Sequence, residues 1–174
     1  RIAADMVREL LCSNAARPVA WEFPAKKLPV VPENYGKGHF LALDAAKTSS
    51  EWKLNVPDWS KIPGSMRDNY VKLPVLEAST PGASLTLSFE GSCIGAFVLA
   101  GPDAGTVLCS VDGEPERKVE FWHVFSGGLH YPRSVMFADG LSSGKHILTL
   151  KIVKESNFQS KGTAIRILHF EENF

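Results

Sequence analysis

The stretch FEGSCIGAFVLAGPDAGTVLCSVDG, from Phe89 to Gly113, decides the fold expected for this chain. Two apolar runs flank a short turn, in which Pro102 favours the φ of a type I turn and Gly105 can adopt a positive φ. The pattern predicts a β-hairpin across this turn. The face expected to enter the core carries Gly95, Phe97, Leu99, Val107, Cys109 and Val111, and we expect another segment to cover the opposite face.

Beyond this stretch, short apolar runs alternate with Gly, Pro, Asp and Ser, and no helical period separates them. Such spacing predicts an all-β fold, an antiparallel β-sandwich of the jelly-roll or galactose-binding-like kind. The expected strands are 84–89, 92–100, 106–112, 118–123, 133–138, 145–153 and 164–170.

The chain divides by composition into three parts. Residues 1–12 include RIAADMVRELL, whose apolar side chains recur with the period of an amphipathic helix. Residues 13–82 are rich in proline, which predicts a wrapping segment with short edge strands near 39–43 and 70–76. Residues 83–174 form the core sandwich, and we expect 13–174 to fold as one unit.

Charge and cysteine content exclude several classes of protein. The 174 residues carry 19 Lys and Arg against 19 Asp and Glu, so no basic excess attracts nucleic acid or anionic lipid. No apolar run reaches the roughly 20 residues of a membrane-spanning helix. Three cysteines argue against a disulfide framework, and the expected hairpin register holds Cys93 and Cys109 too far apart to bridge. Both are expected to be buried free thiols.

No complete catalytic constellation stands out, so whether the chain is an enzyme stays open. The five histidines lack metal-ligand spacing, and neither a metal nor another cofactor is expected. Ser126 and His130 could act as nucleophile and base, but no orienting acid accompanies them. The acidic group Asp112, Glu114 and Glu116 is typical of a solvated loop, although it could also hold calcium or supply a carboxylate pair.

Aromatic side chains offer a different kind of site. A sugar ring stacks its apolar face on Trp or Tyr while nearby polar groups bind its hydroxyls. The alternative is that each Trp belongs to the core or to an interface between domains. The candidate carbohydrate-binding residues are Trp52, Trp59, Trp122, His130, Tyr131 and Arg133.

From about Ser79 onward the chain resembles the β-sandwich accessory domain of bacterial SGNH (GDSL-type) hydrolases. The resemblance rests on Phe89–Gly113, on Phe125 with Leu129 and His130, on LSSGKH ending at His146, and on the run from Ser160 to Phe170. The opening helix is similar to the last helix of the hydrolase domain, which follows the catalytic Asp and His. No GDS-like nucleophile block or DxxH motif is present, so no catalytic residue carries over.

The resemblance implies a non-catalytic accessory domain of an esterase acting on acyl esters, including those of carbohydrates. It would buttress the catalytic domain or shape substrate access, and its partner would be an N-terminal catalytic domain of the same protein. A periplasmic or secreted location is implied by the same resemblance. Two alternatives stay open: a carbohydrate-binding module, and a chain that itself retains hydrolase activity.

Overall fold

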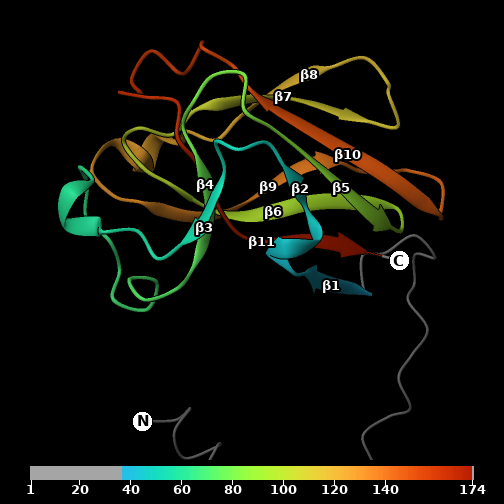
Figure 1. The fold of residues 1–174 in the computed structure, drawn as a ribbon, viewed down its shortest axis with the longest axis horizontal. Helices are drawn as coiled ribbons and strands as arrows, with labels where there is room; N and C mark the ends of the chain where they lie inside the picture. The colour runs from blue at the N-terminus through green and yellow to red at the C-terminus, as the bar shows by residue number, and fades with distance from the viewer. Residues whose placement is uncertain (1–36, 174) are drawn as a thin grey trace, which may run out of the picture. The chain divides into compact units, whose positions relative to one another are not determined.

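The computed structural model describes residues 37–173, which form two antiparallel sheets (Figure 1). The six-stranded sheet has the order β3 (Lys53–Asn55), β4 (Val75–Ala78), β11 (Ile165–Asn173), β6 (Cys93–Ala100) and β9 (Tyr131–Ala138), and β1 (Gly38–Leu41) also pairs with β11. The five-stranded sheet has the order β2 (Lys47–Thr48), β5 (Ser84–Glu90), β10 (Lys145–Ile152), β7 (Thr106–Val111) and β8 (Arg117–Glu120).

The sandwich core lies between the sheets and follows from alternation within each strand. In β10, the side chains of Leu148, Leu150 and Ile152 are buried while Lys145 and Lys151 reach solvent. The same period buries Leu85, Leu87 and Phe89 in β5. Because each strand directs alternate side chains inward, the two sheets share one apolar core.

The predicted antiparallel β-sandwich is confirmed, and each of the seven expected strands is present. The expected edge strand at 39–43 corresponds to β1. The one expected at 70–76 begins only at Val75, directly after Pro74, and lies between β3 and β11 rather than at an edge. Three short 3-10 turns, η1 (Leu43–Ala45), η2 (Trp59–Lys61) and η3 (Val124–Gly127), complete the elements of the described residues.

The hairpin expected between β6 and β7 is wrong, because the two strands belong to different sheets. Residues 101–105 cross the sandwich, and the Gly105 amide donates to the Ala164 carbonyl. Since both faces of β6 are apolar, the sequence pattern could not separate a neighbouring strand from a facing one. In the structure, β6 buries Ile94, Ala96, Val98 and Ala100 in the core and directs Phe97 to the outer face of its sheet. The sequence pattern predicts the reverse, with Phe97 on the core face of β6.

Cys93 and Cys109 are buried free thiols, as predicted. Cys93 lies on β6 and Cys109 on β7, so the two thiols belong to different sheets. The expected hairpin register therefore does not account for their separation. Burial raises the pKa of both thiols. Cys12 and the amphipathic helix expected at 1–12 lie outside the described residues.

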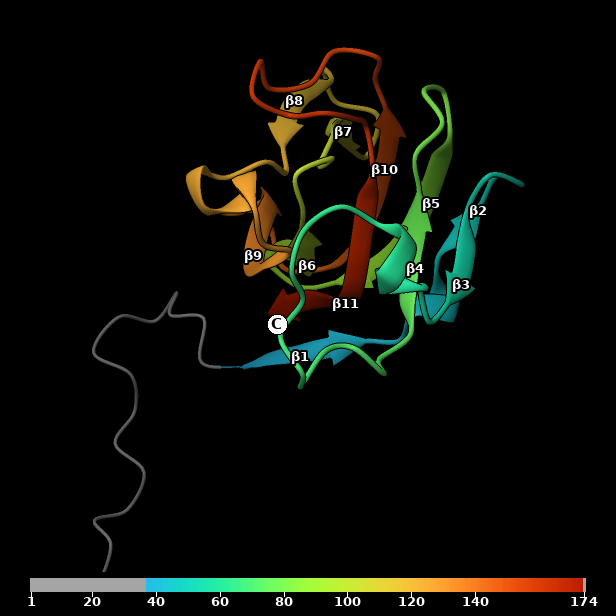
Figure 2. The same cartoon turned by 90° about the vertical axis from the view of Figure 1, so that its left-hand side faces the viewer.

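The outer faces of the two sheets differ in chemistry. On the five-stranded sheet, β5 presents Ser84, Thr86 and Ser88, and only Ile147 of β10 interrupts the polar surface with a large exposed apolar side chain. The outer face of the six-stranded sheet instead exposes Phe40 and Met136. Figure 2 shows β1, which carries Phe40, running beside β11. No helix within residues 37–173 is long and apolar enough to cross a membrane.

Candidate functional site

Four rings form a continuous row on the outer face of the six-stranded sheet. Tyr70 contacts Phe97 with ring centres 6.2 Å apart, Phe97 stacks on His169 at 5.2 Å with 6° between ring planes, and His169 contacts Phe40 at 4.0 Å. We call these four residues the aromatic row. It joins β1, β6 and β11 with the loop before β4, so residues distant in sequence create one surface.

A β-bulge in β11 contributes to this surface. The pairing of β11 with β6 shifts between Ile167 and His169. Ile167 and Phe170 are both fully buried in the core, whereas Leu168 and His169 between them are half-buried and line the same outer groove. The extra residue thus places two consecutive side chains on the outer face, which simple alternation would not allow.

A shallow groove of about 200 Å³ lies beside the row. Its lining is mostly apolar and consists of Leu43, Tyr70, Leu73, Pro74, Phe97, Leu168 and His169. Phe40 lies at the end of the row, and 68% of its surface is exposed. An exposed ring beside an apolar groove distinguishes this face from an ordinary solvated sheet.

Polar groups border the row on its other side. Ser134 Oγ of β9 donates to Glu171 Oε1 at 3.2 Å, and His169 Nε2 lies 3.5 Å from the same oxygen. In the register of the sheet, Glu171 lies opposite Phe40 on one side and Gly95 on the other, and Gly95 is opposite Met136. The face therefore combines rings with a carboxylate that has unused acceptor capacity.

The six predicted carbohydrate-binding residues do not gather on one open face. Trp52 is 6% exposed and belongs to the core, and His130 is fully buried. Trp59, Trp122, Tyr131 and Arg133 are half-buried. Trp59 Nε1 donates to the Val71 carbonyl at 3.1 Å, while Trp122 Nε1 is buried and has no hydrogen-bond partner within residues 37–173. A ligand can therefore reach neither Trp52 nor His130 in this structure.

Trp59 and His130 instead take part in a network at one end of the sandwich, the end of η2 and η3 (left in Figure 1). Arg166 of β11 donates to both carboxylate oxygens of Asp103 at 2.8 Å and to Glu77 at 3.1 Å, and its guanidinium lies 5.9 Å from the Trp59 ring centre. Burial opposes the charge on Arg166, but these carboxylates outweigh burial and raise its pKa. The network holds residues 101–105, which follow β6, against the neighbouring strand β11.

His130 is buried within this end of the sandwich. Its ring centre is 4.8 Å from that of Trp59, and burial, followed by the charge of Arg166, lowers its pKa. Ser126 is also fully buried, and its Oγ accepts from the His123 amide at 3.1 Å to cap η3. Since substrate cannot contact either group, the structure gives no support to Ser126 and His130 as nucleophile and base.

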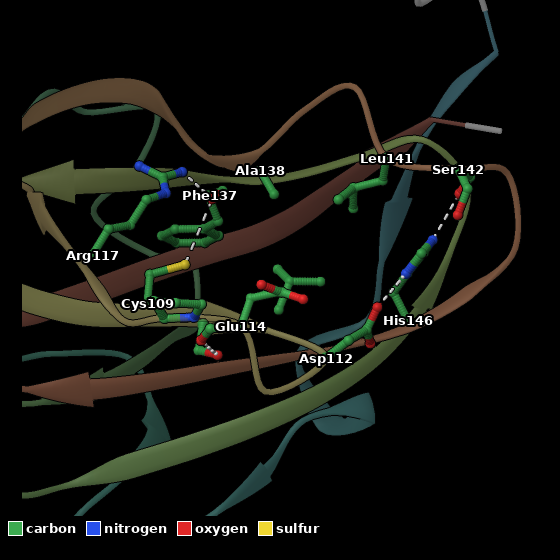
Figure 3. Close-up of a pocket in the computed structure, with 12 residues that line it drawn as sticks. Cys109, Asp112, Glu114, Arg117, Phe137, Ala138, Leu141, Ser142 and His146 are labelled. Carbon is green, nitrogen blue, oxygen red and sulfur yellow. Dashed lines mark hydrogen bonds and ion pairs between the residues drawn. The ribbon is translucent and has the colours of Figure 1, made fainter.

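A second cavity, of about 350 Å³, opens at the edge between the sheets near the β7–β8 turn (Figure 3). Apolar side chains of Cys109, Val111, Phe137 and Leu141 line it, and Asp112, Glu114, Arg117 and His146 are also among its lining residues. His146 Nδ1 pairs with Asp112 Oδ2 at 2.6 Å, and His146 Nε2 pairs with the Ser142 carbonyl at 2.8 Å. Both ring nitrogens face oxygen acceptors, an arrangement that favours the doubly protonated ring over a free base.

Replacing His146 with glutamine tests this doubly protonated ring. The hydrogen bond to Asp112, followed by that to Ser142, raises the pKa of His146. A raised folded-state pKa stabilises the fold fully below about pH 6.5, the ordinary histidine value, and this stabilisation is lost as pH rises through the folded pKa. We therefore expect the wild type to have a higher free energy of unfolding than His146→Gln at pH 6. The difference between the two proteins should be smaller at pH 9, as measured by urea denaturation. An equal difference at both pH values would contradict a charged ring.

The acidic residues after β7 have different surroundings in the structure. Asp112 adopts a positive φ and accepts from both His146 and the Ile147 amide, and these hydrogen bonds lower its pKa. Glu114 and Glu116 are exposed. Among residues 37–173, no three His, Cys, Asp or Glu side chains converge as metal ligands would.

Sequence reasoning missed the aromatic row for identifiable reasons. Phe97 belongs to the core face of the expected hairpin, and His169 falls inside the strand expected at 164–170 without metal-ligand spacing. The available signal was in β11, where Ile167 and Phe170 are three residues apart and break the two-residue alternation. A bulge there would have directed His169 outward.

Comparison with solved structures shows what the fold resembles. No protein-family model and no curated protein matches the chain. A two-domain esterase active on acetylated mannans superposes with a TM-score of 0.66 at 14% identity, covering 99% of this chain and 45% of the esterase. Its complex with mannopentaose gives a TM-score of 0.65. A family two carbohydrate esterase from Cellvibrio japonicus superposes with a TM-score of 0.52 at 14% identity, covering 78% of this chain and 33% of that enzyme.

The chain thus spans less than half the length of the esterases that it matches. At these identities the likeness establishes the shared fold and not a shared activity. Several of these structural neighbours are carbohydrate-active enzymes, and their catalytic functions belong to chains more than twice as long as this one.

Proposed function

We propose that this β-sandwich is a non-catalytic accessory domain of an SGNH-type esterase that acts on acylated carbohydrates. The observation that carries the proposal is the superposition of nearly the whole chain on under half of a two-domain esterase active on acetylated mannans. The sequence resemblance to accessory domains of such hydrolases supports it independently. The histidines of the described residues that could pair with Ser126 or Asp112 are buried or fully hydrogen-bonded, which is consistent with a non-catalytic role.

The accessory role predicts changes in both stability and substrate turnover when this domain is deleted from the longer protein that would contain it. Deleting residues 37–174 should lower the melting temperature of the catalytic part, because a buttress stabilises what it packs against. If the domain shapes substrate access, kcat/KM should fall for acetylated mannan but change less for p-nitrophenyl acetate, which needs no extended cleft. Unchanged stability together with unchanged turnover of both substrates would overturn the proposal. The isolated 174-residue chain should not hydrolyse p-nitrophenyl acetate above the level of Ser126→Ala.

A second candidate function is carbohydrate binding by the domain itself. The aromatic row favours it, because an exposed ring with a carboxylate alongside is the surface chemistry that sugar rings require. The original candidates Trp59, Trp122, Tyr131 and Arg133 remain part of this hypothesis as half-buried side chains near η2 and η3.

A further inference from the structure

We infer that the outer face of the six-stranded sheet binds a neutral glycan along the aromatic row, which deepens the second candidate function and rests on it. The row supplies the apolar half of such a site. Phe40 is 68% exposed and is supported by His169, whose ring centre is 4.0 Å away. His169 is in turn stacked on Phe97, so the exposed ring rests on a rigid base and loses little freedom on binding.

Glu171 supplies the polar half and distinguishes a glycan from a protein partner. Its carboxylate lies between Phe40 and Gly95 in the cross-strand register, within the face and not at its margin. A dry protein interface would have to bury this charge, and charged residues are depleted at interface cores for that reason. Sugar hydroxyls can donate to the carboxylate, as Ser134 Oγ already does at 3.2 Å.

The shape and charge of the face specify the ligand further. Across the register of the sheet, Glu171 lies opposite Gly95, and Gly95 lies opposite Met136, so the exposed Met136 side chain continues the surface beyond the carboxylate. The groove beside Tyr70 and Leu73 continues the apolar surface at the other end of the row. A carboxylate at the centre would repel uronates and sulfated sugars, so the glycan class is an uncharged, extended chain.

Two substitutions test the site with the intact 174-residue chain. The probes are neutral hexasaccharides of β-1,4-linked mannose, glucose and xylose, titrated by calorimetry, with oligogalacturonate as the charged comparison. We expect saturable binding to at least one neutral hexasaccharide, weakened about tenfold by Phe40→Ala, which removes the exposed ring. Glu171→Gln should also weaken binding, since a neutral amide accepts hydroxyl hydrogen bonds less strongly.

A matched control separates loss of the site from general loss of a phenylalanine. Phe158 is 92% exposed in the loop between β10 and β11 and belongs neither to the row nor to the lining of the groove, so Phe158→Ala should bind as the wild type does. The methyl resonance of Met136, which lies opposite Gly95 on the same face, should shift on titration of the wild type.

Two outcomes would overturn the inference: no saturable binding to any neutral hexasaccharide, or binding that Phe40→Ala and Glu171→Gln leave unchanged. The first would leave the face as a protein-docking surface. Neither outcome bears on the accessory role, because that role is measured by stability and ester turnover in the longer protein without added oligosaccharide.

Discussion

Replacing Asp103 with alanine is expected to lower the free energy of unfolding by about 3 kcal/mol. Asp103 holds both terminal nitrogens of Arg166 at 2.8 Å, and the Arg166 side chain is only 6% exposed. Removing the carboxylate leaves a buried guanidinium with Glu77 as its remaining partner at 3.1 Å. A buried charge that loses its partner is far more costly than a pair that was never formed. Urea denaturation at neutral pH measures the change.

The network also predicts strong coupling between its members. Arg166→Met should be destabilising alone, but the double variant with Asp103→Ala should cost much less than the two single changes together. Asp58→Ala is the comparison, because Asp58 pairs with Lys61 at 2.9 Å on the exposed surface and caps η2 through Ser60, and losing both should cost no more than about 1 kcal/mol. If Asp103→Ala and Asp58→Ala lowered the free energy of unfolding equally, the Asp103 carboxylate would not be needed to stabilise the buried charge of Arg166.

Gly105→Ala is expected to destabilise the fold by about 3 kcal/mol, at the upper end of overpacking effects. A β-carbon at Gly105 would lie 2.5 Å from the carbonyl oxygen of Thr163 and 2.6 Å from its carbonyl carbon. These are backbone atoms of a segment joined to the turn by hydrogen bonds from Gly105 to Ala164 and from Ala164 to Asp103, so neither side can move freely. Thermal unfolding should show a lowered melting temperature.

Gly127→Ala provides the comparison for this substitution. A β-carbon at Gly127 would meet no atom within 4 Å, so its unfolding free energy should change by no more than about 0.5 kcal/mol. If Gly105→Ala were as stable as Gly127→Ala, residues 101–105 would not pack as closely against the loop before β11 as the structure shows.

The strands were predictable from sequence because a two-residue alternation is a local property. In β10, one pass along KHILTLKI separates the core side chains from the solvent side chains without knowledge of any partner strand. Sheet membership is not local. Both faces of β6 are apolar, and the segment after it is compatible with a hairpin, so nothing within Phe89–Gly113 shows that β6 and β7 lie in opposite sheets.

The candidate site depended on that missing information. Phe97 changes from core to surface once β6 is paired with β11, and only then does it meet His169. Trp52 and His130 were candidates because of residue type, yet their burial is decided by segments far away in sequence, such as the pairing of Ser65 with Leu129 beside His130. The Asp112 and His146 pair likewise joins residues 34 positions apart.

The central place of β11 in its sheet has a consequence for how the polypeptide is made. β1, β4 and β6 all pair with β11, and Gly38 lies opposite Asn173 in the register. The five-stranded sheet is complete once Ile152 has left the ribosome, but the other sheet lacks its shared partner until synthesis has passed Asn173. During that interval three strands present unpaired edges, and nascent chains in this state are prone to edge-to-edge association. The six-stranded sheet therefore cannot close until its last strand has been synthesised, although four of its other strands precede β9 in the chain.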